Sequence, residues 1–82
     1  MKMLTELKTQ RKVVGIKQLR KSLRNGTIIR VFLAENADPG LMEPLAEECA
    51  RLGVETVLVP TMAELGKACG ISVGAAAAGL LA

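Results

Sequence analysis

Apolar residues recur along this chain with two different spacings, and these spacings predict alternating helices and strands. Leu19 and Leu23 are four residues apart, which predicts a helix over about residues 16–25 with one buried face. The run at 27–34 is β-branched and almost entirely apolar, which is typical of a central strand buried on both faces. Gly26 separates these two elements, because glycine readily adopts the left-handed conformation that ends a helix.

The second half of the chain shows the same alternation. Asp38 can act as an N-cap, and Pro39 suits the first turn of the helix that follows. Thr61 and Glu64 have the spacing of a capping box, which predicts the start of another short helix that stops at Gly70. The other expected elements are a short helix at 3–10, a short strand at 13–14, a strand at 54–59, a loop at 71–74 and a last strand in the alanine-rich tail.

The helix that follows Asp38 contains a second proline, Pro44. Because proline lacks an N–H donor and is tolerated best in the first turn, the regular helix is expected to start near residue 41. Gly53 is expected to end it. Four residues at helical spacing are expected to share its buried face: Leu41, Leu45, Cys49 and Leu52.

Helices and strands therefore alternate over short connections. Such an order places helices on both faces of a single sheet. A chain of 82 residues forms one domain, residues 1–82, and a domain of this size buries only about 60–65% of its unfolded surface. The sequence thus predicts an α/β fold with a small but genuine core.

Charge divides the chain into two unlike parts. Residues 1–30 hold nine basic residues and one acidic residue, a net charge of +8, whereas residues 31–82 hold two basic and seven acidic residues, a net charge of −5. Clustered cations of this density attract a polyanion, most often a nucleic acid. The nine basic residues are Lys2, Lys8, Arg11, Lys12, Lys17, Arg20, Lys21, Arg24 and Arg30.

Composition excludes several kinds of function. The one aromatic residue, Phe32, lies in a predicted buried strand, so the chain cannot stack several bases on aromatic rings. With no histidine and two separated cysteines, it cannot supply a four-ligand zinc site. Cys49 and Cys69 lie on apolar-patterned segments and are expected to be buried, reduced thiols of a cytoplasmic protein.

Neither catalysis nor membrane insertion is expected. The glycines at 66, 70 and 74 lack the spacing of a phosphate-binding loop, and no nucleophile stands in a catalytic arrangement. The basic N-terminus lacks the apolar run of a signal peptide, and the apolar stretch at 71–82 is too short to span a bilayer, which takes about 20 residues. We therefore expect no enzyme, no cofactor, no metal and no membrane partner.

The predicted helix at 16–25 is the first candidate binding site. Lys17, Gln18 and Lys21 lie in its first turns, and Arg20 and Arg24 form an adjacent basic stripe. Cations near a helix N-terminus oppose the helix dipole and repel one another, which suggests that an anion binds there. A merely solvated basic face remains the alternative.

The loop at 71–74 is the second candidate. Ile71 and Val73 are β-branched apolar residues in a short segment between two glycines. They either pack into the core or are displayed to a partner, and composition alone does not decide between these alternatives.

Three segments extend this interpretation. The segments 15–21 (GIKQLRK), 34–39 (AENADP) and 65–73 (LGKACGISV) occur in the order and spacing of the kink-turn RNA-binding ribosomal-protein family, and the chain most resembles its bacterial YbxF-type members. The resemblance covers essentially the whole chain. It implies a three-layer α/β/α sandwich with a mixed sheet of about four strands.

The resemblance also implies which residues contact RNA. In the family, the start of the second helix enters the widened major groove at a kink-turn and contacts guanines of tandem sheared G·A pairs. The matching residues here are Gly15, Lys17, Gln18 and Lys21. Archaeal and eukaryotic relatives usually carry Asn-Glu in place of Lys17-Gln18. The change replaces a neutral–acidic pair with a cationic–neutral one and keeps donors for guanine, which is similar to the bacterial subgroup.

Other matching positions complete the implied interface. The family's late loop packs apolar groups against an unstacked nucleotide, and Ile71, Ser72 and Val73 occupy that loop. Asp38 lies where some relatives contact the flipped base, although its capping role is sufficient by itself. Lys67 is a candidate phosphate contact. The remaining phosphate contacts expected are Lys8, Arg11, Lys12, Arg20 and Arg24.

The sequence thus predicts a non-catalytic, cytoplasmic, monomeric protein that recognises kink-turns in structured RNA and stabilises the kinked form, in association with the ribosome or another transcript. One alternative is a basic adaptor domain that docks on an acidic protein. Another is attachment to an anionic membrane through residues 1–24, which is disfavoured because the short helices offer no long apolar face.

Overall fold

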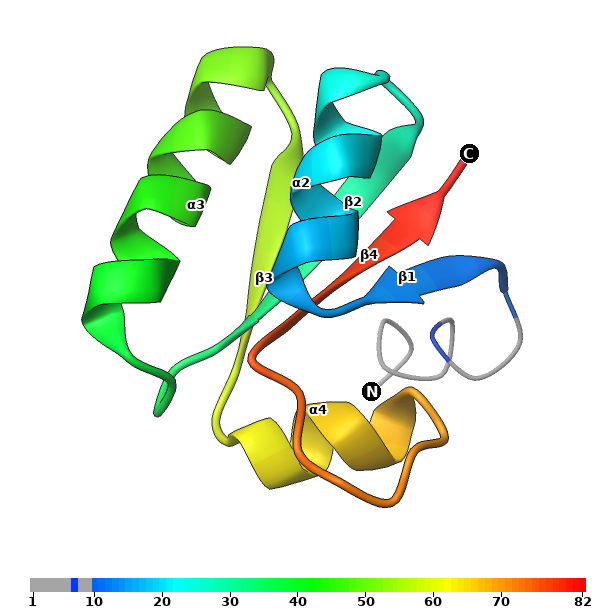
Figure 1. Cartoon of the computed structure of the whole chain (residues 1–82), viewed down its shortest axis with the longest axis vertical. Helices are drawn as coiled ribbons and strands as arrows, with labels where there is room; N and C mark the ends of the chain where they lie inside the picture. The colour runs from blue at the N-terminus through cyan, green and yellow to red at the C-terminus, as the bar shows by residue number, and fades with distance from the viewer. Residues whose placement is uncertain (1–6, 8–9) are drawn as a thin grey trace.

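The chain folds into seven elements within the part that the computed structural model describes, Leu7 and residues 10–82 (Figure 1). Each element predicted in this part is present. Most of the helix expected at 3–10, together with Lys2 and Lys8, lies outside the described residues. The elements are β1 (Lys12–Val14), α2 (Ile16–Arg24), β2 (Ile28–Ala34), α3 (Pro39–Leu52), β3 (Glu55–Val59), α4 (Met62–Ala68) and β4 (Ala77–Leu81).

The four strands form one mixed sheet in the order β1-β4-β2-β3. Strand β4 runs antiparallel to both of its neighbours, whereas β2 and β3 are parallel. As a result β1, β2 and β3 end at the same edge of the sheet, and β4 begins there. The mixed four-stranded sheet expected from the sequence is confirmed.

Helices cover both faces of the sheet, as predicted. Helices α2 and α3 contribute Leu19 and Leu45 to a cluster on one face that also contains Val31. Helix α4 contributes Leu65 to a second cluster on the other face, where it meets Phe32 and Leu7. The two clusters make the three layers of an α/β/α sandwich.

The centre of the sheet departs from the predicted pattern at one position. Strand β2 lies between β4 and β3, and most of its side chains are buried. Its pairing with β4 is irregular between Ile28 and Arg30, and Ile29 is exposed rather than buried. On the other side, Arg30 Nε donates a hydrogen bond of 2.7 Å to Oε1 of Glu55 on β3.

Two expectations about α3 were wrong. The helix begins at Pro39 rather than near residue 41, and Pro44 lies in its interior. Asp38 provides the N-cap as predicted, because its Oδ1 accepts a hydrogen bond of 2.9 Å from the N–H of Gly40. With this cap in place the first turn forms upstream of Pro44, and the helix accommodates a residue without an N–H donor.

The buried face of α3 is also rotated from the expected one. Leu45 and Cys49 are buried as predicted, but Leu41 and Leu52 are 51% and 47% exposed. Met42 instead packs against both core clusters. Because Met42 and Cys49 are seven residues apart, they lie nearly in line along the helix, and this line faces the sheet.

Helix α4 begins with the predicted cap. The Thr61 hydroxyl oxygen accepts a hydrogen bond of 3.1 Å from the N–H of Glu64. A second cap was not predicted, in which the N–H of Met62 donates a hydrogen bond of 2.8 Å to Oδ1 of Asn36. Asn36 follows β2, so this contact fixes the start of α4 against the end of the central strand.

We expect Thr61→Ala to lower the free energy of unfolding by about 1 kcal/mol, the usual cost of losing an N-cap oxygen. Thr61→Ser is the matched control because it keeps the hydroxyl. Urea denaturation followed by circular dichroism measures both. Equal losses in the two variants would show that the methyl group, rather than the cap, carries the effect.

Candidate nucleic-acid interface

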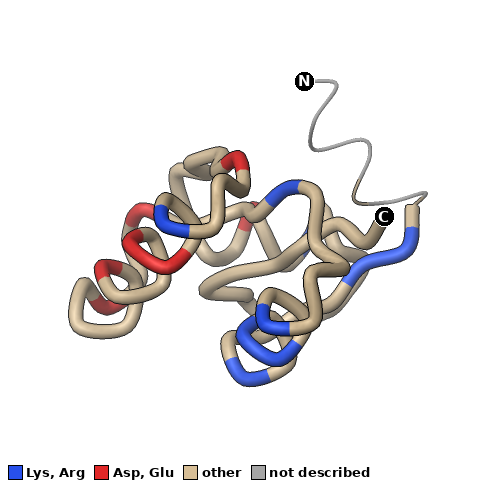
Figure 2. The backbone as a smooth tube through the Cα atoms, turned by 90° about the horizontal axis from the view of Figure 1, so that it is seen from above, with Lys and Arg blue, Asp and Glu red and all other residues tan. Residues whose placement is uncertain are grey.

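Most of the charged residues that the structure describes are divided between two sides of the molecule (Figure 2). Cations follow β1 and α2, whereas carboxylates follow α3. The cations of β1 and α2, with Arg11 just before them, are Arg11, Lys12, Lys17, Arg20, Lys21 and Arg24. The charge division expected from the sequence is therefore also a division in space.

The start of α2 is open to a ligand. Gly15 precedes the helix with φ 101° and ψ 147°, and it offers no side chain to cap the first-turn N–H groups. A residue with a Cβ is strained at such a positive φ, although no heavy atom lies within 4 Å of the position that a Cβ would take. Glycine is therefore required here by the backbone conformation, and it places no side chain over the N-terminus of α2.

Three predicted contact residues project from this end of the helix into solvent. Lys17 and Gln18 are exposed in the first turn of α2, and Lys21 is exposed one turn later. Leu19 and Leu23 hold the opposite face against the sheet. Since free N–H groups and cationic side chains lie at the same end of α2, this end can bind an anion or the acceptor atoms of a base edge.

The loop at 71–74 lies at the same edge of the sheet as the start of α2. The N–H of Gly15 donates a hydrogen bond of 3.0 Å to the carbonyl of Ala77, at the start of β4. The N–H of Ala75 donates one of 3.0 Å to the carbonyl of Met62. Because β4 leads directly out of the loop, these bonds fix the loop relative to both α2 and α4.

The loop displays its apolar residues rather than burying them. Val73 is 68% exposed, Ile71 is 38% exposed, and Ser72 between them is exposed as well. The N–H of Ile71 donates a hydrogen bond of 3.1 Å to the carbonyl of Gly66 on α4. Exposed β-branched residues on a backbone held in this way make a compact apolar surface at the edge.

Gly66 brings the loop close to α4. A Cβ at this position would collide with the backbone carbonyl of Val73 and would lie 3.0 Å from Cα of Gly74. This role of Gly66 was not predicted, although a glycine inside a helix often has a packing reason. It is the residue that lets the loop cross α4 in contact with its backbone.

Asp38 and Lys67 occupy different positions at this interface. Asp38 is exposed at the same edge, and its Oδ1 is engaged in capping α3. Lys67 is exposed in the last turn of α4, one residue before the segment that leads into the loop. Asp38 is thus open to solvent at the start of α3, and Lys67 is open to solvent shortly before the 71–74 loop.

Arg20 is turned toward the acidic helix, which the sequence did not predict. Its Nε lies 3.4 Å from Oε1 of Glu48 on α3. Arg24 lines the groove between α2 and α3 together with Arg20 and Glu47. These two arginines therefore lie at the margin of the basic surface. Among the described residues, neither Lys17 nor Lys21 forms an ion pair or a hydrogen bond with a carboxylate.

The cysteines are buried free thiols, as predicted. Burial raises the pKa of Cys49, and the nearby Glu48 carboxylate raises it further. Burial also raises the pKa of Cys69, and the charge of Lys12 partly offsets this rise. Both thiols are therefore neutral and poor nucleophiles near neutral pH. No group of three or more potential metal ligands gathers within the described part of the chain.

Comparison with known proteins agrees with this arrangement. Residues 1–81 match the Ribosomal protein L7Ae/L30e/S12e/Gadd45 family. The chain belongs to this family. Its relatives include a protein named RNA-binding protein YbxF from Geobacillus stearothermophilus, which is 39% identical over 69 residues and 84% of each chain. An RNA-binding protein of Caldanaerobacter subterraneus subsp. tengcongensis is 40% identical over 68 residues and 83% of each chain.

Relatives of other kinds extend the family likeness. The large ribosomal subunit protein eL8 of Halobacterium salinarum is 39% identical over 69 residues, which are 83% of this chain and 58% of that protein. Among solved structures, a Giardia lamblia 15.5 kDa RNA-binding protein superimposes with a TM-score of 0.89 at 27% identity, over 98% of this chain and 71% of that one. The L7Ae family and a YbxF-type relationship are thus confirmed.

Proposed function

We propose that this chain is a non-catalytic RNA-binding protein that recognises kink-turns and stabilises the kinked form of the RNA. The observation that carries the proposal is the meeting of two unlike surfaces at one edge of the sheet. One is the open, cationic start of α2, and the other is the exposed apolar loop at 71–74. Relatives named as RNA-binding proteins support the same class of ligand.

The start of α2 would read the base edges. Lys17, Gln18 and Lys21 carry donors that match the O6 and N7 acceptors of guanine, and Gln18 can also address adenine. A regular RNA helix has a major groove too narrow for side chains, so this mode requires RNA whose groove is widened. Tandem sheared G·A pairs at a kink expose guanine edges in such a groove.

The loop would cover an unstacked nucleotide. Ile71 and Val73 offer aliphatic surface, and Ser72 between them adds a hydroxyl. The chain has no exposed aromatic ring for stacking, because Phe32 is fully buried. Aliphatic contact is therefore the means by which it would shield a base that the kink has turned out of the helix.

Cations around these two surfaces would neutralise phosphates that the bend brings together. Arg11, Lys12 and Arg24 are exposed or half-buried along β1 and α2, and Lys67 approaches from α4. Arg20 would contribute less, because it already faces Glu48. Only the kinked RNA presents the groove and the extruded base together, so binding would shift the RNA from its extended to its kinked population.

The proposal extends to the oligomeric state, the cellular compartment and the RNA partner of the protein. We infer that the protein acts as a monomer in the cytoplasm and binds ribosomal RNA or another structured transcript. No helix in the described part of the chain is long and apolar enough to cross a bilayer.

The proposal is tested by titrating a short kink-turn RNA at fixed physiological salt, beside the same RNA with its tandem G·A pairs changed to Watson–Crick pairs. We expect the change to weaken binding by about tenfold or more, which is about 1.4 kcal/mol. A docking surface for an acidic protein would bind both RNAs weakly and equally. Equal affinities would therefore replace kink-turn recognition by generic polyanion binding.

Lys21→Ala tests the assignment of α2. We expect it to cost about 1–3 kcal/mol of binding on the G·A-containing RNA, because it removes a donor from the base-reading end of the helix. Arg51→Ala is the matched control, since it removes one exposed cation from the acidic helix α3. If both variants bind with the same affinity, the effect of Lys21 is one of net charge alone.

A further inference from the structure

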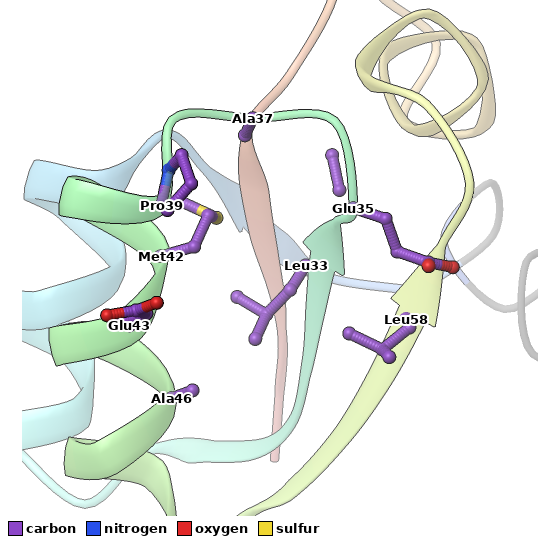
Figure 3. A pocket seen from close by; sticks show the side chains of 9 residues that line it. Leu33, Glu35, Ala37, Pro39, Met42, Glu43, Ala46 and Leu58 are labelled. Atoms are coloured by element: carbon purple, nitrogen blue, oxygen red, sulfur yellow. The ribbon is translucent and has the colours of Figure 1, made fainter.

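An open pocket lies on the acidic side of the molecule, away from the basic residues of α2. It is about 290 Å³ in volume and lies between α3 and strand β3 (Figure 3). Leu33 and Leu58 form its floor on the sheet, and Met42 and Ala46 approach from α3. No residue of α2 or of the loop at 71–74 lines the pocket, although Ala37 and Pro39 on its rim flank Asp38.

The sheet is open beside this pocket. Strand β3 is the last strand in the order β1-β4-β2-β3, and within the described residues it pairs only with β2. Leu58 is 62% exposed, which makes it an apolar side chain displayed on a free sheet edge. Such edges commonly carry Lys, whereas β3 has one charged residue, Glu55, at its start.

The charge around the pocket is uniformly negative. Glu35 and Glu43 line it, and no Lys or Arg does. Glu47, one turn beyond Glu43 on α3, does not line the pocket but the groove on the other side of the helix, together with Arg20 and Arg24. The field of Glu35 and Glu43 repels nucleic-acid phosphates and attracts a cation, which is the opposite preference from that of α2.

We propose that this pocket binds an extended basic segment of another protein. The segment lies beside β3, extends the sheet through main-chain hydrogen bonds, and inserts one leucine-sized side chain between Leu58 and Met42. Basic side chains that flank the inserted one face Glu35 and Glu43. Pairing along a sheet edge with a pocket for an alternate side chain is an established mode of peptide recognition.

The observations select this occupant over others. The pocket is slightly smaller than usual small-molecule sites, which run from about 300 to 1,000 Å³, and it is open rather than enclosed. It therefore suits one anchoring side chain of a longer ligand. The carboxylate rim requires that the ligand be cationic, and the adjacent free strand provides hydrogen-bonding groups for an extended backbone.

The probe is the blocked peptide acetyl-Lys-Thr-Leu-Thr-Lys-amide, titrated into the 15N-labelled full chain. Alternate residues of an extended peptide share a face, so both lysines flank the leucine on the side that faces the pocket. We expect amide shifts centred on Leu33, Met42, Ala46 and Leu58. Replacing the leucine by serine, or both lysines by glutamate, should weaken binding by about tenfold or more.

Variants of the chain locate the site. Leu58→Ser and Glu43→Gln should each weaken peptide binding several-fold, because one removes an apolar wall and the other a charge of the rim. Leu52→Ser and Glu47→Gln are matched controls, since both residues are exposed on α3 and neither lines the pocket. Amide spectra that remain unchanged elsewhere establish that each variant keeps the fold.

Three results would overturn the proposal. The first is the absence of localised shifts up to millimolar peptide. The second is an equal response to the lysine and glutamate peptides. The third is a concentration-dependent dimer that Leu58→Ser abolishes, because the occupant would then be a second copy of this chain. Sedimentation equilibrium of the wild type and of Leu58→Ser shows whether such a dimer forms and whether it depends on Leu58.

Discussion

Gly66→Ala should destabilise the protein by about 2–3 kcal/mol and weaken its binding to kink-turn RNA by about tenfold or more. Helix propensity alone predicts the opposite sign, because alanine in a helix interior is more favourable than glycine by about 1 kcal/mol. The tertiary contact decides the sign. The added Cβ collides with the carbonyl of Val73, and it would lie 3.0 Å from Cα of Gly74.

The colliding atoms belong to the backbone, so a change of side-chain rotamer cannot relieve the contact. The loop must move away from α4, and the hydrogen bond from the N–H of Ile71 to the carbonyl of Gly66 is then lost. Ile71 and Val73 would no longer be held in their present positions. Because the proposed RNA contact requires the loop and α2 together, the loss of affinity follows from the displacement of the loop.

Ala63→Gly is the matched control for this experiment. Ala63 is exposed on the same helix, and the substitution lowers helix propensity by about 1 kcal/mol without touching the loop. Chemical denaturation and RNA titration of both variants separate the two effects. Increased stability in Gly66→Ala, with unchanged RNA affinity, would show that the loop adapts to a Cβ.

Local sequence signals predicted the elements of this fold well, and the reason is that the elements are bounded by strong caps. Asp38 and Thr61 accept the hydrogen bonds expected of N-caps, and Gly53 ends α3 in the left-handed conformation. Each of these contacts joins residues close in sequence. Such contacts are specified by residue type and spacing, without knowledge of the rest of the molecule.

Features that depend on how elements pack could not be predicted in the same way. Leu41 and Leu52 have the right spacing for the core, but α3 turns Met42 toward the sheet in their place. The ion pair between Arg20 and Glu48 joins residues 28 positions apart, on two helices whose distance the sequence does not specify. Both errors concern the rotation or separation of helices, which the whole core determines.

In the candidate site, too, local features were predictable and features that depend on packing were not. The amphipathic pattern of α2 was enough to predict that Leu19 and Leu23 face inward, and this is confirmed; Lys17 and Lys21 are exposed. Composition left open whether Ile71 and Val73 are buried, because their exposure depends on how the loop crosses α4. Gly66 controls that crossing from five residues upstream of Ile71, and only the packed structure reveals the contact.

Gly79→Val should lower the free energy of unfolding by about 3 kcal/mol, the upper end of the usual cost of overpacking a core. Strand propensity again predicts the opposite sign, since valine is enriched in strands and glycine is depleted. Gly79 lies in the middle of β4, opposite both Val13 and Val31. A Cβ there would lie 2.5 Å from Cδ1 of Leu19 and 3.0 Å from Cδ1 of Ile28.

These two atoms end flexible side chains, but neither side chain has space to move. Leu19 is fully buried and Ile28 nearly so, and both belong to the cluster beneath α2. The helix as a whole must therefore rise from the sheet to admit valine. That movement would also shift Gly15, whose N–H is bonded to Ala77 two residues before Gly79.

Thermal and urea unfolding of Gly79→Val measure the loss of stability, and Leu81→Val is a control on the same strand at a half-buried position. Leu19→Ala combined with Gly79→Val gives the decisive comparison, because it removes the atom that the new side chain meets. If the clash is the cause, the double variant should be more stable than the sum of the two single effects predicts. If the two stability losses are instead strictly additive, the loss in Gly79→Val arises within strand β4. Gly79 would then not determine the spacing between α2 and the sheet.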